Sequence, residues 1–259
     1  MKRFLYLFIL LGLLIQACGA LSVETPSSTA APSDTPEPTQ TPLPTETPTP
    51  VPTSTPERTA TAAAGIEQAS NTILDELEQL LGETDIPYED GHLAWKQVKS
   101  LMVSLRGPGQ NYVEFDRDLV GENFILKSDV TWEASGIIVC GVIFRSEPNL
   151  EKGRQYKFSY LRLSGLPAWA IELFEFGQFR NSLTSTQFSN AVNQKNSATN
   201  QVVLVAQDEQ FTLYLNRVRQ GRYFDNSKQR MDGSFAFYGA QDSGEGTCNF
   251  ENSWVWTLE

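Results

Sequence analysis

Histidine, cysteine and methionine are the residues this 259-residue chain has least of, with one, three and three copies. Any Ser-His-Asp triad would need His92, which stands beside Gly91 at the start of the first expected strand. A metal site of histidine and cysteine cannot be assembled from one histidine if the cysteines have other roles. We therefore expect no triad and no cofactor, and interpret His92 as a surface residue.

Basic residues are also scarce, with 20 Lys and Arg against 31 Asp and Glu and a formal net charge of -11 at pH 7. Removing Lys2 and Arg3 with the N-terminal leader leaves 20 − 2 = 18 against 31, a net charge of 18 − 31 = −13. An acidic domain repels nucleic acid and anionic lipid surfaces. We expect no nucleic-acid partner.

The apolar run from Phe4 to Ile15 is too short for a permanent membrane span, and Lys2 and Arg3 precede it. This order predicts a secretory signal over residues 1–17. The residues around Cys18 resemble the lipobox of bacterial lipoproteins, in which that cysteine is acylated and becomes the mature N-terminus. The resemblance implies that Cys18 carries membrane lipid and that the protein is extracytoplasmic and anchored to the cell membrane. The alternative is a secreted protein with an incidental cysteine.

Residues 18–61 have the composition of a tether, because ten of the fourteen prolines lie between Glu24 and Thr61 in a Thr-Pro rhythm. Proline fixes φ and removes backbone donors, so no core can form there. A polyproline-like segment at ~3.1 Å per residue would reach on the order of 100 Å. We expect this low-complexity segment to hold a folded domain away from the membrane.

Residues 62–83 predict an amphipathic helix of about four turns, with Gly82 as a stop. Its apolar residues recur at helical spacing: Ile66, Ile73, Leu74, Leu77, Leu80 and Leu81. This stripe can pack on the following domain. It can also support weak self-association, because Ile66, Ile73, Leu77 and Leu80 approximate a two-heptad seam.

Residues 84–259 change to short alternating runs separated by Gly, Asn and Asp, which indicates an all-β sandwich. Eleven strands are predicted: His92 to Gln97, Leu101 to Leu105, Tyr112 to Asp116, Phe124 to Trp132, Ile138 to Arg145, Gln155 to Leu163, Trp169 to Phe176, Gln201 to Gln207, Phe211 to Asn216, Gly233 to Gly239 and Cys248 to Leu258. The clearest hairpin joins two of them at Asp208-Glu209. This number of strands suits a two-sheet jelly roll.

Cys140 and Cys248 are the pair left once Cys18 is set aside, and an exported protein favours a disulfide between them. Cys140 alternates with the apolar residues of its strand. In the last strand, Cys248 alternates in register with Trp254 and Trp256. We therefore expect both cysteines to face the interior, and we expect the two tryptophans to pack against Phe124 and Trp132.

The motif order DVTW, CGVIFR, QYKFSYLRLSGLPAW, LVAQ…FTLYLN and CNFENSWVW resembles concanavalin A-like (laminin G-like) jelly-roll domains. It is similar in particular to uncharacterised bacterial lipoproteins that carry this domain behind a Thr-Pro tether. The resemblance implies a two-sheet jelly-roll sandwich of the lectin and glucanase type. Such domains include lectins, glycan-binding modules and β-glucanases, and a related family hydrolyses keto-sugar glycosides.

Glu172 and Glu175 are the nearest approach to the acidic motif that retaining glucanases of this fold carry at alternate strand positions. A spacing of three sends two side chains of a regular strand to opposite faces, which prevents the ~5 Å pairing that retention needs. The middle acid of the motif is also absent. We interpret Glu172 and Glu175 as a solvated carboxylate and a strand-end charge.

Sugar rings stack on aromatic side chains and form hydrogen bonds with planar polar groups. The ligand-binding candidates are Trp169, Tyr156, Arg145 and Asn193, whose alternative roles are core or rim aromatics, an ion-pair partner and a turn former. Asp116, Asp118 and Glu122 can hold a loop calcium ion or be ordinary solvated charges. We expect a non-catalytic domain that binds carbohydrate or another surface polymer. The alternatives are a jelly-roll glycoside hydrolase and a structural or protein-interaction module.

Overall fold

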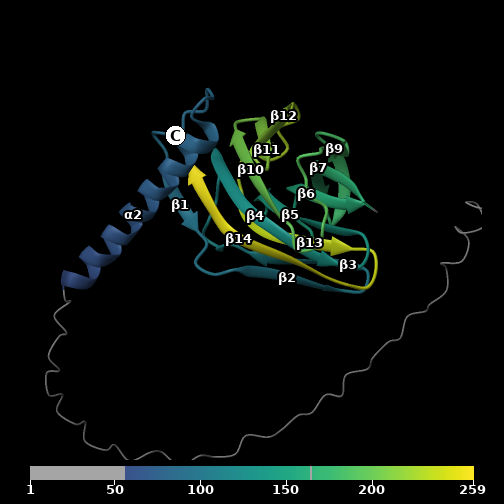
Figure 1. Cartoon of the computed structure of the whole chain (residues 1–259). Coiled ribbons are helices and arrows are strands. Elements are labelled where there is room, and N and C mark those ends of the chain that lie inside the picture. The colour runs from purple at the N-terminus through teal and green to yellow at the C-terminus, as the bar shows by residue number, and fades with distance from the viewer. Residues whose placement is uncertain (1–55, 164) are drawn as a thin grey trace, which may run out of the picture. The chain divides into compact units, whose positions relative to one another are not determined.

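The structure is a computed structural model that describes residues 56–163 and 165–259, with helix side chains described from Gly65 onward. Helix α2 (Pro56–Leu81) precedes the described strands, which form two antiparallel sheets (Figure 1). The expected signal segment, Cys18 and the tether up to residue 55 lie outside the described residues. None of the described helices is long and apolar enough to cross a membrane.

The first sheet, here called sheet A, contains seven strands. Its order is β1 (His92–Lys96), β14 (Glu245–Thr257), β4 (Phe124–Ala134), β10 (Thr199–Gln207), β11 (Gln210–Leu215) and β12 (Val218–Phe224), and β2 (Leu101–Arg106) also pairs with β14. The predicted hairpin at Asp208-Glu209 is confirmed, because Gln207 and Gln210 are paired across that turn.

Sheet B also contains seven strands. Its order is β3 (Gly109–Glu114), β13 (Ser234–Gln241), β5 (Ile138–Ser146), β6 (Gln155–Leu163), β7 (Leu166–Glu175) and β8 (Gln178–Ser182), and β9 (Gln187–Phe188) also pairs with β7. The two sheets enclose one apolar core, which confirms the predicted all-β jelly-roll sandwich.

The predicted disulfide is present and joins the two sheets. Cys140 on β5 and Cys248 on β14 are bonded, with their Cα atoms 5.7 Å apart. Both side chains are buried in the core between the sheets, as the alternation of their strands predicts.

The prediction that Trp254 and Trp256 pack against Phe124 and Trp132 is wrong. A register shift lies between Glu251 and Trp254, where Asn252 has a φ of 50°. Such a bulge moves the following side chains to the opposite face of the sheet. Cys248 therefore faces the inter-sheet core, whereas both tryptophans lie on the outer face of sheet A.

Helix α2 packs on that outer face, which confirms the first of the two roles considered for its apolar stripe. Its residues Ile73, Leu77 and Leu81 are buried. Their partners come from four strands and the segment after the helix: Ile125, Val203, Val205, Tyr214, Trp254, Trp256, Ile86 and Tyr88. Ile66 is 64% exposed, so the coiled-coil contact stays a prediction.

The observed helix begins at Pro56, earlier than the predicted start at residue 62 and inside the expected tether. Proline is well tolerated in the first helical turn, where its missing N–H has no intrahelical partner. The helix ends at Leu81, and the backbone N–H of Gly82 donates to the Glu78 carbonyl at 2.9 Å, in agreement with the predicted stop.

Candidate functional site

Two of the four predicted ligand-binding residues are core aromatics. Trp169 on β7 is 2% exposed and packs edge-to-face on Tyr223, with 5.6 Å between ring centroids. Tyr156 on β6 is fully buried, and its hydroxyl donates to the Asp225 carboxylate. Neither ring can stack on a sugar at the surface, so the prediction for these two residues is wrong.

Arg145 and Asn193 form loop contacts instead of a binding site. The buried Arg145 guanidinium donates to the Glu122 carbonyl at 2.7 and 3.1 Å and lies 5.1 Å from the Phe211 ring centroid. Asn193 is exposed, but its backbone N–H donates to Oδ1 of Asn200 at 2.7 Å. The proposed constellation is therefore not assembled. Arg145 acts as an internal clamp and Asn193 as a turn former.

The Asp225 carboxylate connects the loop after β12 to Tyr156. Burial alone would raise the pKa of this carboxyl. Hydrogen bonds from Ser227, Tyr156 and the backbone N–H of Gln229 outweigh the burial and hold the pKa below its ordinary value of 3.8. The group is thus a structural anion with its lone pairs already engaged.

The carboxylates of Glu172 and Glu175 serve different partners. Glu175 pairs with Arg154 at 2.6 Å and Arg180 at 3.1 Å, and these cations lower its pKa. Glu172 lies opposite Lys157 on β6. Burial raises the pKa of Glu172, and the lysine partly offsets this. With Glu175 engaged by two arginines, the pair has no free nucleophile and acid facing one another.

His92 and the acidic loop also have local roles. His92 is exposed, and its Nδ1 lies 2.9 Å from the Thr257 hydroxyl oxygen. Asp116 accepts from the backbone N–H of Asp118 at 3.1 Å. Within the described ranges no three acidic, histidine or cysteine side chains gather closely enough to hold a metal ion. Calcium binding stays a prediction.

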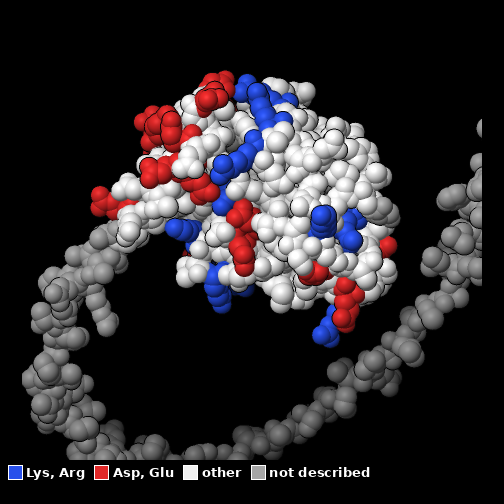
Figure 2. All heavy atoms as spheres, viewed as in Figure 1, with Lys and Arg blue, Asp and Glu red and all other residues white. Residues whose placement is uncertain are grey.

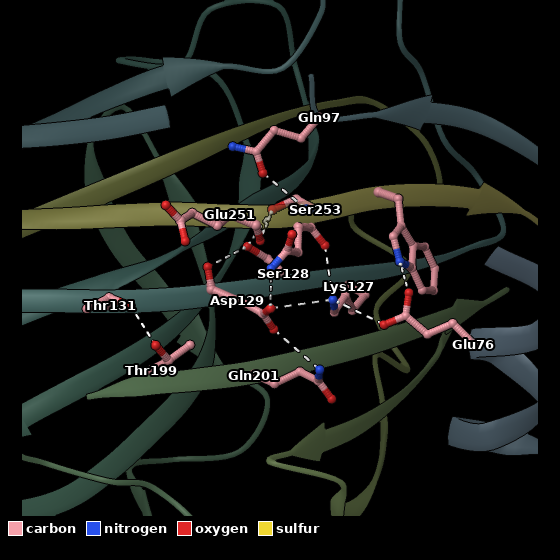
Figure 3. Close-up of polar contacts among 12 residues, drawn as sticks. Glu76, Gln97, Lys127, Ser128, Asp129, Thr131, Thr199, Gln201, Glu251 and Ser253 are labelled. Atoms are coloured by element: carbon pink, nitrogen blue, oxygen red, sulfur yellow. Dashed lines mark hydrogen bonds and ion pairs between the residues drawn. The ribbon is translucent and has the colours of Figure 1, made fainter. Parts of the chain in front are cut away.

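A groove of about 490 Å³ lies where α2 meets sheet A. It is lined by Thr72, Ile73, Glu76, Lys96, Gln97, Val98, Lys99, Ser100, Lys127, Glu251, Asn252, Ser253 and Trp254. Lys127 and Glu76 line its floor, and Figure 3 shows Lys127 between Glu76 of α2 and Asp129, which lies with the lysine on β4. The Lys127 Nζ lies 3.1 Å from Glu76, 3.5 Å from Asp129 and 3.1 Å from the Asn252 carbonyl.

The polar groups of this floor contact one another. The Lys127 ammonium forms ion pairs with Glu76 and Asp129 and donates a hydrogen bond to the Asn252 carbonyl. The second oxygen of Glu76 accepts from the Trp254 indole at 2.9 Å. The network therefore attaches the helix to the sheet and leaves little bonding capacity for a ligand.

The outer face of sheet B has a different character. Residues paired across antiparallel strands point to the same side, so the core residues Tyr156, Trp169 and Leu173 fix which neighbours point outward. The residues here called the sheet B face are Gln110, Tyr112, Lys157, Ser159, Glu172, Phe174, Phe179, Phe188 and Tyr238. Five of these nine side chains are aromatic.

Lys157 lies at the centre of the sheet B face, between two aromatic rings. Its Nζ is 4.3 Å from the Phe174 ring centroid and 5.0 Å from that of Tyr238, and it donates to Gln110 Oε1 at 3.2 Å. The lysine is 3% exposed, and burial lowers its pKa from 10.5 to about 8. The negative charge of Glu172 acts in the opposite direction and raises this pKa. Cation–π contacts and one amide thus hold a cation beneath the surface.

Tyr238 lies across the neighbouring strand because residue 141 is glycine. A Cβ at Gly141 would come within 2.6 Å of the Tyr238 ring and 2.0 Å of the Phe158 carbonyl oxygen. The Tyr238 hydroxyl reaches the Ser159 hydroxyl, a contact that crosses β5. The centre of the face is therefore a packed polar and aromatic layer with a defined shape.

The edge of the sheet B face is open. Phe179 is 54% exposed and Phe188 is 61% exposed, and Phe179 contacts Phe174 edge-to-face with 6.2 Å between centroids. Sequence reasoning missed this face because it selected Tyr156 and Trp169, whose neighbours Lys157 and Ala170 point outward. Because successive side chains of a strand point to opposite faces, a choice that is one residue off selects the wrong face of the sheet.

The chain matches no protein-family model and no curated protein. Among solved structures it is similar to the carbohydrate-binding module CBM66 from Bacillus subtilis, with 17% identity over 59% of this chain and 84% of that chain and a TM-score of 0.48. A Bacillus subtilis protein of unknown function with a galectin-like fold gives 10% identity, 65% and 89% coverage and a TM-score of 0.48. A Bacillus licheniformis β-glucanase is similar with 9% identity over 62% of this chain and 79% of that chain, and the TM-score is 0.42.

Proposed function

We propose that this protein binds carbohydrate, without turnover, on the sheet B face. The observation that carries the proposal is the set of exposed rings beside polar groups at the open edge of this face. Phe179 packs on the partly exposed Phe174, with Glu172 two residues before it on β7. Phe188 pairs with β7 farther along that strand, at Ala168. Sugar rings have apolar C–H faces that stack on aromatic rings, and their hydroxyls need planar polar partners. Both elements occur together on this face, whereas α2 covers much of the outer face of sheet A.

The rigidity of this face supports binding. Lys157, Ser159 and Tyr238 are almost fully buried and hold one another through the contacts described above. A ligand that meets preformed side chains loses less free energy to ordering them. The exposed rings of Phe179 and Phe188 then provide the first stacking contacts.

The test is the binding of the full chain to a glycan panel, compared with variants. Phe179→Ala and Phe188→Ala should each weaken binding of the best glycan by roughly tenfold, in line with about 1–2 kcal/mol for a stacked ring. Phe224→Ala is the matched control, because Phe224 is 53% exposed but lies on β12 of sheet A. Equal losses in all three variants, or no glycan bound by the parent chain, would contradict the proposal.

Two other functions remain as outcomes of the same experiment. Cleavage of a bound glycan that disappears in Glu172→Gln would mean a hydrolase. Capture of a protein ligand that survives Phe179→Ala would mean a protein-interaction module. The engagement of Glu175 by two arginines favours binding over hydrolysis.

We also propose that acylation of Cys18 anchors the protein to the cell membrane, on the strength of the sequence around that residue. Mass spectrometry of the mature N-terminus tests this proposal, and Cys18→Ser should abolish membrane retention. An unmodified N-terminal residue other than Cys18 would mean simple secretion.

A further inference from the structure

Three arginines lie close together at the free edge of sheet A, in a chain whose net charge is -11. Arg217 is in the turn before β12, and Arg219 and Arg222 are on that strand. We call these three residues the arginine edge. Figure 2 shows Asp and Glu gathered over α2 and the adjoining chain, with a separate line of Lys and Arg beside them. The charges of this domain are therefore segregated.

The turn that presents Arg217 is built at a conformational cost. Leu215 and Val218 are paired, so Asn216 and Arg217 form a two-residue turn, with φ values of 48° and 67°. Such turns strongly prefer glycine at the second position, because other residues are strained at positive φ. Asn216 is fixed by its side chain, which donates to the Ala191 carbonyl at 2.6 Å. No such contact within the described residues accounts for an arginine at position 217.

A bulge then brings the other two arginines to one face. Side chains three residues apart on a regular strand point to opposite faces. Here the register shifts at Gln220, and Gly221 has a φ of 158°, so Arg219 lies opposite Tyr214 and Arg222 opposite Thr212. Tyr214 and Thr212 both point to the outer face of sheet A, so Arg219 and Arg222 do as well.

Little of this positive charge is neutralised inside the described part of the chain. Arg222 pairs with Asp85 at 3.1 Å, but the Asp85 side chain is 79% exposed, and an exposed pair of this kind exchanges readily. Arg217 and Arg219 form no ion pair with any described residue. Both are exposed, so their guanidinium groups are open to an incoming anion.

We propose that the arginine edge binds a linear anionic polysaccharide whose repeating sugars carry carboxylates. Guanidinium groups bind carboxylates through two parallel hydrogen bonds. From Arg217 to Arg222 the strand spans roughly 16 Å at ~3.3 Å per residue, which suits several successive charges of a polymer better than one small anion. This site lies on a different sheet from the sheet B face and takes a different ligand charge, so the proposal stands independently of that function.

The test measures binding of the full chain to polygalacturonate at low and at physiological ionic strength. The double variant Arg219→Gln/Arg222→Gln should weaken binding about tenfold or more, since it removes two charge-assisted contacts. The double variant Arg106→Gln/Arg117→Gln has the same net charge but changes exposed arginines away from β12, and it should change the affinity by less than about twofold. Equal losses in the two variants would mean a general charge effect and would overturn the proposal.

Two further measurements test whether the arginine edge prefers another anionic partner. Tighter binding to a single-stranded polynucleotide than to polygalacturonate, or concentration-dependent self-association abolished by Arg219→Gln/Arg222→Gln, would overturn the polysaccharide proposal. Neutral dextran should not compete.

Arg217→Gly separates binding from folding. Glycine relieves the positive-φ strain, so the melting temperature should rise, while the affinity for polygalacturonate should fall. A variant that melts higher and binds as tightly as the parent chain would remove Arg217 from the site.

Discussion

At the scale of single residues, the two buried lysines of the described part of the chain are Lys127 and Lys157, and each depends on its own surroundings. The Lys127 side chain is 5% exposed and is held by carboxylates from α2 and from its own strand, whereas Lys157 lies between aromatic rings. Removing one partner of a buried ion pair usually costs more than the pair contributes, because the other charge is left uncompensated. The two lysines should therefore respond differently to substitution.

Replacing Lys127 with Met should lower the free energy of unfolding by roughly 1–3 kcal/mol, because Glu76 and Asp129 lose their common counter-ion. Chemical denaturation of the full chain measures this change. Lys99→Met, at an exposed lysine of the same groove, is the control and should have little effect. A Lys127→Met variant as stable as the control would mean that the network does not hold the helix.

Lys157→Met should alter the pH dependence of stability. Burial lowers the pKa of Lys157 from 10.5 to about 8, so between these values the unfolded chain holds a proton that the folded chain has released. The contribution of this group to stability is therefore unfavourable below pH 8 and improves as the pH rises towards 10.5. The variant should gain most relative to the parent chain below pH 8, and a pH-independent difference between the two would contradict this assignment.

At the scale of elements, α2 is held mainly by one buried stripe. Leu77→Ala removes a fully buried side chain at the helix–sheet contact and should cost about 2–4 kcal/mol in thermal or chemical unfolding. Ile66→Ala changes a residue of the same helix that is 64% exposed and should stay within about 0.5 kcal/mol. Comparable losses at both positions would place the contact elsewhere on the helix.

The strands that sequence periodicity predicts are those with one buried face. β6 is observed over the predicted Gln155–Leu163, and the β10–β11 hairpin turns at the predicted residues. β8, β9 and β12 were missed because they are short or largely exposed edge strands without apolar alternation. In β14 the alternation continues visibly through Trp256, yet the bulge at Asn252 reverses it, and no local sequence signal marks that extra residue strongly.

Sequence periodicity was equally insufficient to predict the candidate site. Tyr156 and Trp169 have the residue types that bind sugars, but which face of a strand is buried is decided by the partner sheet. Lys157, Phe174 and Phe179 become neighbours only through the pairing of three strands. Outward positions of the predicted strands could have identified Lys157 and Glu172, whereas Phe179 lies on a strand that was not predicted.

At the scale of the whole molecule, the Cys140–Cys248 bridge joins the two sheets across a sequence separation of 108 residues. Substituting both cysteines with Ala should reduce stability by ~4–5 kcal/mol in the chain-entropy model and lower the melting temperature by several degrees. Because the bridge lies in the core, glycan affinity should be almost unchanged at temperatures where the variant is folded. Loss of binding with an unchanged melting curve would place the pair at a functional surface.

The two proposed binding sites lie on opposite outer sides of the sandwich. The helix and the arginine edge belong to the outer side of sheet A, and the aromatic residues of the sheet B face lie on the other side of the core. A neutral sugar chain and an anionic polymer could therefore bind at the same time, since the two sites share no residue.

Hydrogen exchange of the full chain, followed by mass spectrometry with and without the best glycan from the panel, tests the central claim most directly. Bound glycan should slow amide exchange in the segment from Glu172 to Ser182, which contains the paired parts of β7 and β8. Exchange in the segment from Val218 to Phe224 should be unchanged by a neutral glycan. Protection confined to the α2 groove or to the loops around Asp225, with none over β7 and β8, would contradict the assignment of the sheet B face as the binding site.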